Sequence, residues 1–168
     1  MRVFILPKSS VPAALAVAML GSFLAPAGAS TTATTTFAVS ANVQATCLIS
    51  ATPLAFGTYT GAAATSTSTV SVTCTNTTPY NVSLGAGLAS GATVTTRKMT
   101  GPSAAVLSYA MYSDSARSVN WGQTIGTDTV VGTGNGSSQP LTVYGSVPAG
   151  QYVAPGAYSD TITATVTY

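Results

Sequence analysis

Within residues 65–75, apolar and polar side chains alternate with a period of two from Val70 onward. Val70, Val72 and Cys74 fall on one face of this segment, whereas Ser71 and Thr73 fall on the other. Alternation of this kind is typical of a β-strand that buries one face. We therefore predict a strand here, and similar runs predict further strands at 80–84, 92–96, 106–112, 127–131, 141–147 and 158–168.

Glycine and proline separate these runs, for example at 85–87, 101–102 and 148–150. Short strands at such spacing indicate a β-sandwich or a β-barrel. No segment repeats apolar residues at helical spacing over a useful length. The pattern therefore predicts one all-β domain.

The first residues follow a different pattern. Arg2 and Lys8 precede an apolar run at 11–24, and the small residues Ala27-Gly28-Ala29 follow it. The run is too short for a spanning helix, which needs roughly 20 residues. We predict a signal peptide over residues 1–29, cleaved after Ala29, with Ala27 as the alternative, and a chain exported to the periplasm.

The composition argues against catalysis. Charged residues make up 5% of the 168 residues, whereas globular proteins average about 25%. Hydrophobic residues at 46% exclude disorder of the highly charged kind. Without His or Glu the chain lacks an ordinary general base and a His-based metal site. We predict that it is not an enzyme and binds no cofactor, no metal and no small-molecule substrate.

Charges balance after the predicted leader. We interpret Arg97 and Lys98 as part of a solvated loop or a strand edge, because two basic residues do not form a phosphate-binding patch. We therefore predict no nucleic-acid partner. A neutral surface is unusual for a free monomer and favours packing against copies of the same chain. The opposing charges after residue 29 are Arg97, Lys98 and Arg117 against Asp114, Asp128 and Asp160.

Two cysteines, Cys47 and Cys74, lie in the predicted exported chain. An even number of cysteines in an oxidising compartment favours a disulfide. Because each interrupts or ends an alternating segment, we predict that the bond joins two neighbouring strands. Two buried free thiols are the alternative.

The segment that opens the predicted exported chain also alternates. Its apolar positions are Phe37, Val39, Ala41 and Val43, and it contains no charge, proline or glycine between them. An exposed strand of this kind aggregates unless it is paired. It is either the first strand of the sandwich or a strand that fills a groove in a neighbouring subunit.

The C-terminal segment alternates as well, with Ile162, Ala164, Val166 and Tyr168 on one face and threonines on the other. Three interpretations are open. It is an ordinary last strand, the closing strand of an outer-membrane barrel, or a strand that awaits a partner from another chain. The 8% aromatic content argues against the barrel, which needs aromatic girdles.

An ordered set of motifs resembles a known family. The set comprises F-A-V-S-A-N-V-Q-A-T-C at 37–47, P-L-A-F-G-T-Y at 53–59, V-S-V-T-C-T-N at 70–76, L-S-Y-A-M-Y-S-D at 107–114, V-N-W-G at 119–122, L-T-V-Y-G-S-V-P-A-G-Q at 141–151 and the final stretch from Pro155. Over about residues 35–168, it resembles the spore coat protein U domain family, which includes pilins of archaic chaperone–usher pili.

The resemblance implies an incomplete immunoglobulin-like β-sandwich that a donor strand from a neighbouring subunit completes. It divides the chain into a leader, an N-terminal extension at 30–46 and a pilin domain at 47–168. The donor side chains would be Phe37, Val39, Ala41 and Val43. The acceptor groove and chaperone-contacting edge would be formed by Ile162, Ala164, Val166 and Tyr168, although a slip of one residue would exchange the faces of the donor.

The function implied is that of a structural subunit of a surface pilus that supports adhesion and biofilm formation. Its partners would be other copies or related pilins, a periplasmic chaperone and an outer-membrane usher, and its final location the cell surface. The alternative is a secreted spore-coat or cell-surface coat protein of the same domain family.

Overall fold

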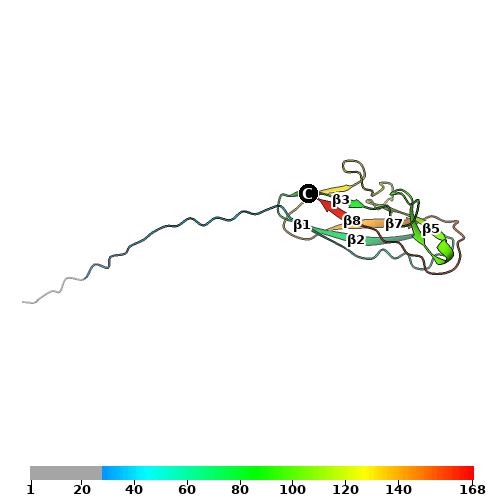
Figure 1. Cartoon of the computed structure of the whole chain (residues 1–168), viewed down its shortest axis with the longest axis horizontal. Helices are drawn as coiled ribbons and strands as arrows, with labels where there is room; N and C mark the ends of the chain where they lie inside the picture. Colours follow the sequence, from blue (N-terminus) through cyan, green and yellow to red (C-terminus); the bar gives the residue numbers. More distant parts are fainter. Residues whose placement is uncertain (1–27) are drawn as a thin grey trace, which may run out of the picture. The chain divides into compact units, whose positions relative to one another are not determined.

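The computed structural model describes residues 28–168. The chain divides into two units, Met1–Ser40 and Ala41–Tyr168 (Figure 1). Residues 28–40 of the first unit are exposed and contain no helix or strand. The predicted leader lies almost wholly outside the described residues and stays a prediction, as do the predicted domain boundaries.

The second unit is built from strands, with a single short 3₁₀ turn, η1, at Pro102–Ala104. Most of its strands follow the alternating runs of the sequence, because each such run buries one face. The strands at Cys47–Ala51 and Arg97–Thr100 lie outside those runs. In chain order, the strands are β1 Cys47–Ala51, β2 Ala64–Cys74, β3 Pro79–Leu84, β4 Arg97–Thr100, β5 Val106–Tyr112, β6 Val130–Thr133, β7 Gln139–Val147 and β8 Ala164–Thr167.

These strands form two antiparallel sheets. The larger has the order β1-β2-β7-β5-β4, and the smaller has the order β6-β3-β8. Every strand pair in both sheets is antiparallel. The prediction of an all-β, immunoglobulin-like sandwich is confirmed.

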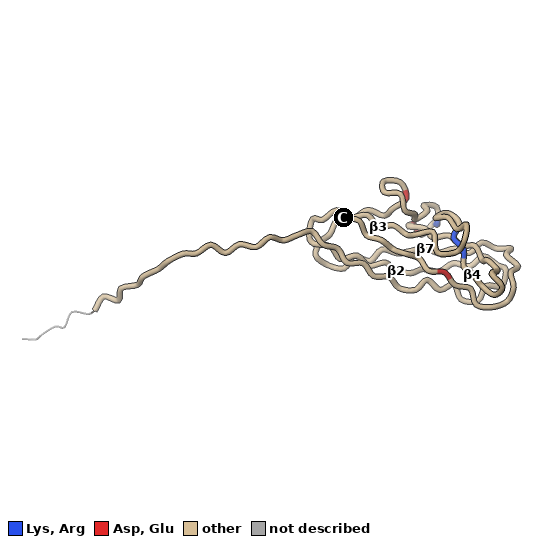
Figure 2. The backbone as a smooth tube through the Cα atoms, in the orientation of Figure 1, with Lys and Arg blue, Asp and Glu red and all other residues tan. Residues whose placement is uncertain are grey.

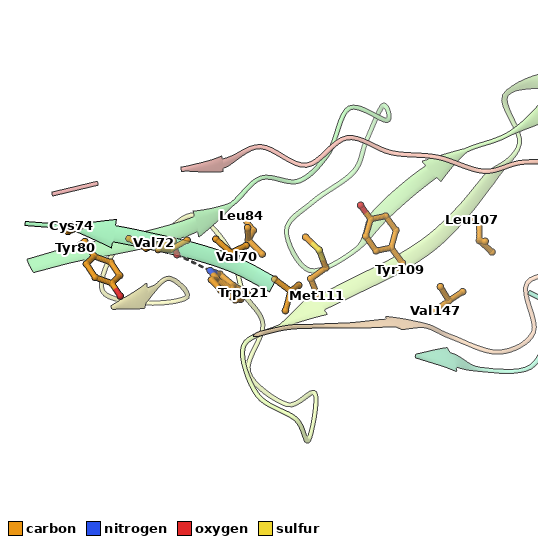
Figure 3. Close-up of a cluster of buried hydrophobic side chains, with 12 residues drawn as sticks. Val70, Val72, Cys74, Tyr80, Leu84, Leu107, Tyr109, Met111, Trp121 and Val147 are labelled. Carbon is orange, nitrogen blue, oxygen red and sulfur yellow. Dashed lines mark hydrogen bonds between the residues drawn. The ribbon is translucent and has the colours of Figure 1, made fainter. Parts of the chain in front are cut away.

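The core lies between the inner faces of the two sheets (Figure 3). Val70 and Val72 of β2 face it from the larger sheet, and Val82 and Leu84 of β3 face it from the smaller. Trp121 is fully buried among them, and its Nε1–H donates to the Val82 carbonyl at 2.8 Å. This bond satisfies the polar edge of the largest core side chain.

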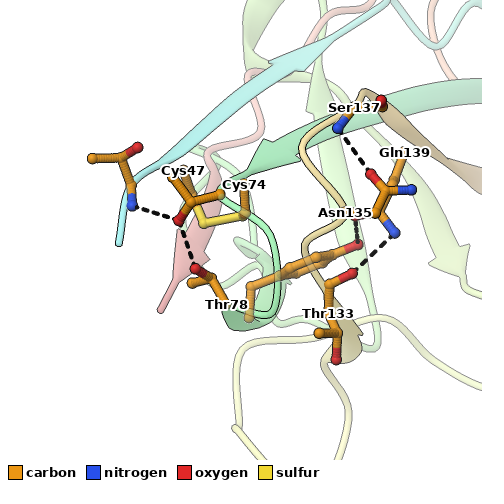
Figure 4. Close-up of a disulfide and its surroundings, with 10 residues drawn as sticks. Cys47, Cys74, Thr78, Thr133, Asn135, Ser137 and Gln139 are labelled. Atoms are coloured by element: carbon orange, nitrogen blue, oxygen red, sulfur yellow. Dashed lines mark hydrogen bonds between the residues drawn. A yellow bond between two sulfur atoms is a disulfide. The ribbon is translucent and has the colours of Figure 1, made fainter. Parts of the chain in front are cut away.

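The disulfide lies at one end of the first strand pair. Cys47 of β1 lies directly opposite Cys74 of β2, and their sulfur atoms are bonded (Figure 4). Next to it, Thr75 N–H donates to the Thr46 carbonyl at 3.0 Å, and Thr46 N–H donates to Thr75 Oγ1 at 3.2 Å. The predicted disulfide between neighbouring strands is confirmed, and the free-thiol alternative is wrong.

The strand predicted at 92–96 is absent. Thr93 and Thr96 instead exchange backbone hydrogen bonds of 3.0 and 3.2 Å, which closes a tight turn, and β4 begins at the next residue, Arg97. The interpretation of Arg97 and Lys98 as a strand edge is confirmed, because β4 is an edge of the larger sheet. A solvated position is wrong for Arg97, whose side chain is 0% exposed.

Two other predicted strands have shifted bounds. The run at 127–131 becomes β6 at Val130–Thr133, because Asp128 accepts from Thr124 N–H at 2.6 Å in the preceding turn. The run at 158–168 contains a strand only over β8, since residues 158–163 cross from the edge of one sheet to the edge of the other.

Charges are sparse over the second unit (Figure 2). Within residues 28–168, no helix has the length and hydropathy needed to cross a membrane. Over the same range, no three His, Cys, Asp or Glu side chains are grouped to hold a metal ion.

Candidate functional site

A groove of about 1030 Å³ opens between two segments that belong to neither sheet. One wall is residues 52–61, which follow β1, and the other is residues 151–162, which precede β8. The floor between the walls consists of apolar side chains from β4 and β5 and one tyrosine, namely Met99, Leu107, Met111 and Tyr109.

The first wall runs beside β2 without pairing to it as a strand. Thr52 N–H donates to the Thr69 carbonyl at 2.9 Å, and the Ser66 hydroxyl donates to the Ala55 carbonyl at 2.6 Å. Leu54 and Phe56 point inward over Gly145 of β7, where a Cβ would come within 2.8 Å of both side chains. The absence of a side chain at Gly145 therefore leaves the space into which Leu54 and Phe56 pack.

The second wall crosses between the sheets. Ser159 exchanges two backbone hydrogen bonds with Thr100 of β4, at 2.9 and 3.1 Å. After Ser159 the chain leaves the larger sheet, and Gly85 N–H donates to the Thr163 carbonyl at 2.9 Å before β8 pairs with β3. The wall is thus attached at one residue to the larger sheet and then to the smaller one.

Within the described residues, no backbone hydrogen bond joins residues 53–60 to residues 151–162. The walls approach each other at one end, where the Tyr59 hydroxyl donates to the Pro148 carbonyl at 2.7 Å and accepts from Gln151 N–H at 3.1 Å. An apolar floor between two walls with free backbone groups can accept an extended strand, which would satisfy those groups.

One polar pair interrupts the apolar lining. The Tyr109 hydroxyl donates to Asp160 Oδ2 at 2.8 Å, and its ring meets that of Phe56 edge to face at 6.0 Å between centroids. Burial, together with this hydrogen bond, raises the pKa of Tyr109 well above its ordinary value, so the hydroxyl stays protonated. Asp160 is therefore held at the groove as a hydrogen-bond acceptor.

The predicted acceptor residues lie only partly in this groove. Ile162 lines it, whereas Ala164 and Val166 belong to β8 and pack against the core. Tyr168 is 57% exposed and is not part of the lining. The groove therefore lies beside residues before β8 rather than beside β8 itself.

Sequence reasoning assigned no role to the first wall. The stretch from Pro53 to Tyr59 is one of the motifs that resemble the family, and its inward residues Leu54 and Phe56 alternate as strand residues do. This alternation is the sequence signal that could have identified the wall. The position of the wall over Gly145, however, depends on a contact with a residue about 90 positions away in the chain.

The predicted donor side chains are free of the sheets. Phe37, Val39 and Val43 are 85%, 84% and 82% exposed, and Ala41 is exposed as well. Residues 28–46 contain no strand. This segment is not the first strand of the sandwich in the structure, because the first strand begins at Cys47.

Comparison with known proteins identifies the family. The Spore Coat Protein U domain matches residues 33–165. This chain belongs to the Spore Coat Protein U domain family. A curated relative, Protein U of Myxococcus xanthus, is 39% identical over an alignment of 178 positions, which spans 96% of this chain and 98% of that protein.

The Spore Coat Protein U domain fold also occurs in a solved complex. It is similar, with a TM-score of 0.58 and 23% identity, to a chain in the crystal structure of the CsuC–CsuE chaperone–tip adhesion subunit pre-assembly complex from archaic chaperone–usher Csu pili of Acinetobacter baumannii. The match covers 75% of this chain and 40% of that chain. The likeness shows the fold of this Spore Coat Protein U domain protein.

Proposed function

We propose that this protein is a structural subunit of a surface pilus, not an enzyme, and that it polymerises by donor-strand complementation. The observation that carries the proposal is a groove with an apolar floor, whose walls share no backbone hydrogen bond within the described residues, in a chain that also has an exposed alternating apolar segment. The segment of one copy fits the groove of the next, and such a heterologous contact does not close, so it forms a fibre.

The partners follow from this role. Before assembly, a periplasmic chaperone would cover the groove, and an outer-membrane usher would exchange it for the next subunit. Family membership and the fold shared with a subunit of a chaperone–usher pilus support these partners. Export to the periplasm and display at the cell surface, with a role in adhesion and biofilm formation, belong to the same proposal.

A coat protein of the spore or cell surface is the second candidate. The description of the matched family, Spore Coat Protein U domain, favours it, and Protein U of Myxococcus xanthus is similar over nearly the full length of both chains. The two roles share the polymerising contact and differ in the assembly formed. Electron microscopy of expressing cells distinguishes them: extended fibres support the pilus, whereas a continuous surface layer supports the coat.

The first experiment tests the polymerising contact itself. The chain from Ser30 onward, with Val39→Asp in its own extension, receives a synthetic peptide of residues 32–46 in trans. We expect the peptide at 100 times its Kd to add about 2.7 kcal/mol of stability. For a chain of this size that corresponds to a rise in Tm of roughly 10 °C.

Matched peptides test the face of the strand. A Val39→Asp peptide should give no rise, because it places a charge against the apolar floor. A Ser40→Asp peptide has the same charge on the alternate face and should retain most of the rise. If the unchanged peptide leaves Tm unaltered, the fold is self-contained and the donor-strand proposal is wrong.

A further inference from the structure

The inward face of the second groove wall has one charged side chain. Alternate residues of this wall and of β8 are half-buried, and the residues between them are exposed. Asp160 interrupts an otherwise apolar or aromatic series and also lines the groove. The half-buried series is Tyr158, Asp160, Ile162, Ala164 and Val166.

The Asp160 carboxylate is fixed in place by three donors. Oδ1 accepts from Leu88 N–H at 2.9 Å and from Thr161 N–H at 2.8 Å, and Oδ2 accepts from the Tyr109 hydroxyl. Gly87 closes over it with φ +93°, and a Cβ there would overlap the carboxylate. The carboxylate therefore cannot swing away when the groove is filled.

A fixed carboxylate has acceptor positions for about four hydrogen bonds, and three are used. The remaining acceptor position, on Oδ2, needs water or a donor. The positive charge of the buried Arg97 side chain lies close enough to interact with Asp160. Covering a carboxylate oxygen without replacing its hydrogen bond costs free energy.

An incoming β-strand presents side chains to the groove at every second residue. One of them must lie beside Asp160. A bulky apolar side chain there would displace water from Oδ2 without replacing its hydrogen bond, whereas a small one leaves space for the water. In the extension, Ala41 is the small residue of the apolar face, between Val39 and Val43.

Strand direction completes the register. Every pair in both sheets is antiparallel, so we take the incoming strand as antiparallel to the second wall. With Ala41 beside Asp160, Val39 then lies beside Ile162, and Phe37 lies beside Ala164. The largest donor side chain thus meets the smallest side chain of the half-buried series, in β8 just beyond the wall.

We propose that Asp160, fixed by Tyr109, sets the register of the incoming strand by accepting Ala41 of a second copy beside it. This inference rests on the proposed function, since it specifies the partner residue at the same groove. The Asp160–Tyr109 pair acts as a specificity determinant: it excludes registers that place a valine or phenylalanine beside the carboxylate.

The test compares peptides in which one side chain is enlarged. The receptor is the chain from Ser30 onward with Val39→Asp, and calorimetry measures the Kd of each peptide. We expect Ala41→Leu in the peptide of residues 32–46 to weaken binding about tenfold or more, because leucine covers the carboxylate. The matched control, Val39→Leu, should weaken it less than about threefold, since an apolar neighbour tolerates a similar apolar side chain. On a receptor that also has Asp160→Ala, the Ala41→Leu penalty should fall below about threefold.

A second pair of peptides needs no change at Asp160, in case that variant does not fold. Ala41→Ser adds a hydroxyl beside the carboxylate and should bind at least as well as the unchanged peptide. Val39→Ser places an unpaired hydroxyl beside Ile162 and should bind about tenfold more weakly.

Three results would overturn the proposed register. They are equal binding of the Ala41→Leu and unchanged peptides, an Ala41→Leu penalty that persists on Asp160→Ala, and a reversed order of the two serine peptides. Each of these requires that the unchanged peptide binds. Failure of the unchanged peptide to bind contradicts the donor-strand proposal instead, so the two failures are distinguishable.

Discussion

At the scale of single residues, the buried guanidinium of Arg97 joins three parts of the second unit. It donates to carbonyl groups at the end of β3 and just after it, of the turn before β4 and of the loop after β5, and burial lowers its pKa. With no acidic partner within ion-pair distance among the described residues, these carbonyls hold the charge. The acceptors are Gly85 at 2.8 Å, Leu84 at 2.9 Å, Val94 at 2.6 Å and Trp121 at 2.6 Å.

We expect Arg97→Lys to lower the free energy of unfolding by about 2–4 kcal/mol, because a compact ammonium cannot reach the carbonyls that the planar fork reaches. Chemical denaturation measures the loss. The matched control is Arg117→Lys, at a partly exposed side chain that donates to the Gly145 carbonyl at 3.1 Å, and it should cost less than about 1 kcal/mol. Equal losses in the two variants would contradict a special role for the buried guanidinium.

At the scale of elements, the Cys47–Cys74 disulfide attaches the edge strand β1 to β2. β1 has no strand on its other side within its sheet, and β8 of the smaller sheet lies next to it. The predicted extension ends at residue 46, directly before Cys47 of this bond. The disulfide therefore holds the base of the predicted donor segment and the start of the first groove wall.

Replacement of both cysteines by alanine should lower the free energy of unfolding by about 3.5 kcal/mol, the chain-entropy value for cysteines 27 residues apart. Denaturation of the variant and of the reduced unchanged chain measures this loss, and the two values should agree. A loss below about 1 kcal/mol would mean that β1 is held by its backbone pairing and packing alone.

At the scale of the whole molecule, the charges after the predicted leader cancel. Three basic and three acidic residues balance one another in number: Arg97, Lys98, Arg117, Asp114, Asp128 and Asp160. Of these, Arg97 is buried in the core and Asp160 lines the groove. Association that depends on an apolar groove and backbone pairing is therefore not steered by charge.

We expect the rate of self-assembly of the chain from Ser30 onward to change less than about twofold between 0.05 and 0.5 M salt, because salt screens only charge-driven contacts. Light scattering at fixed protein concentration measures the rate, and sodium chloride avoids the stronger salting-out of sulfate. A steep fall in rate with salt would show that surface charges, rather than the groove, control association.

Local alternation was enough to predict most strands. In β2, β3, β5 and β7, period-two burial in the structure matches the period-two pattern of the sequence. The pattern failed at 92–96, where threonine hydrogen bonds close a turn, and at 158–163, where the chain changes sheets. Periodicity records which face is apolar, but it does not record whether a partner strand is present.

The sequence by itself determined the all-β class, the disulfide pair and the two terminal segments with apolar faces, because these properties depend on side-chain type and spacing along the chain. Tertiary structure decided where the groove lies, that residues 52–61 form its first wall, and that Asp160 meets Tyr109 within it. It also decided the burial of Arg97. These features join residues far apart in the chain, and their positions follow from how the two sheets pack rather than from any local pattern.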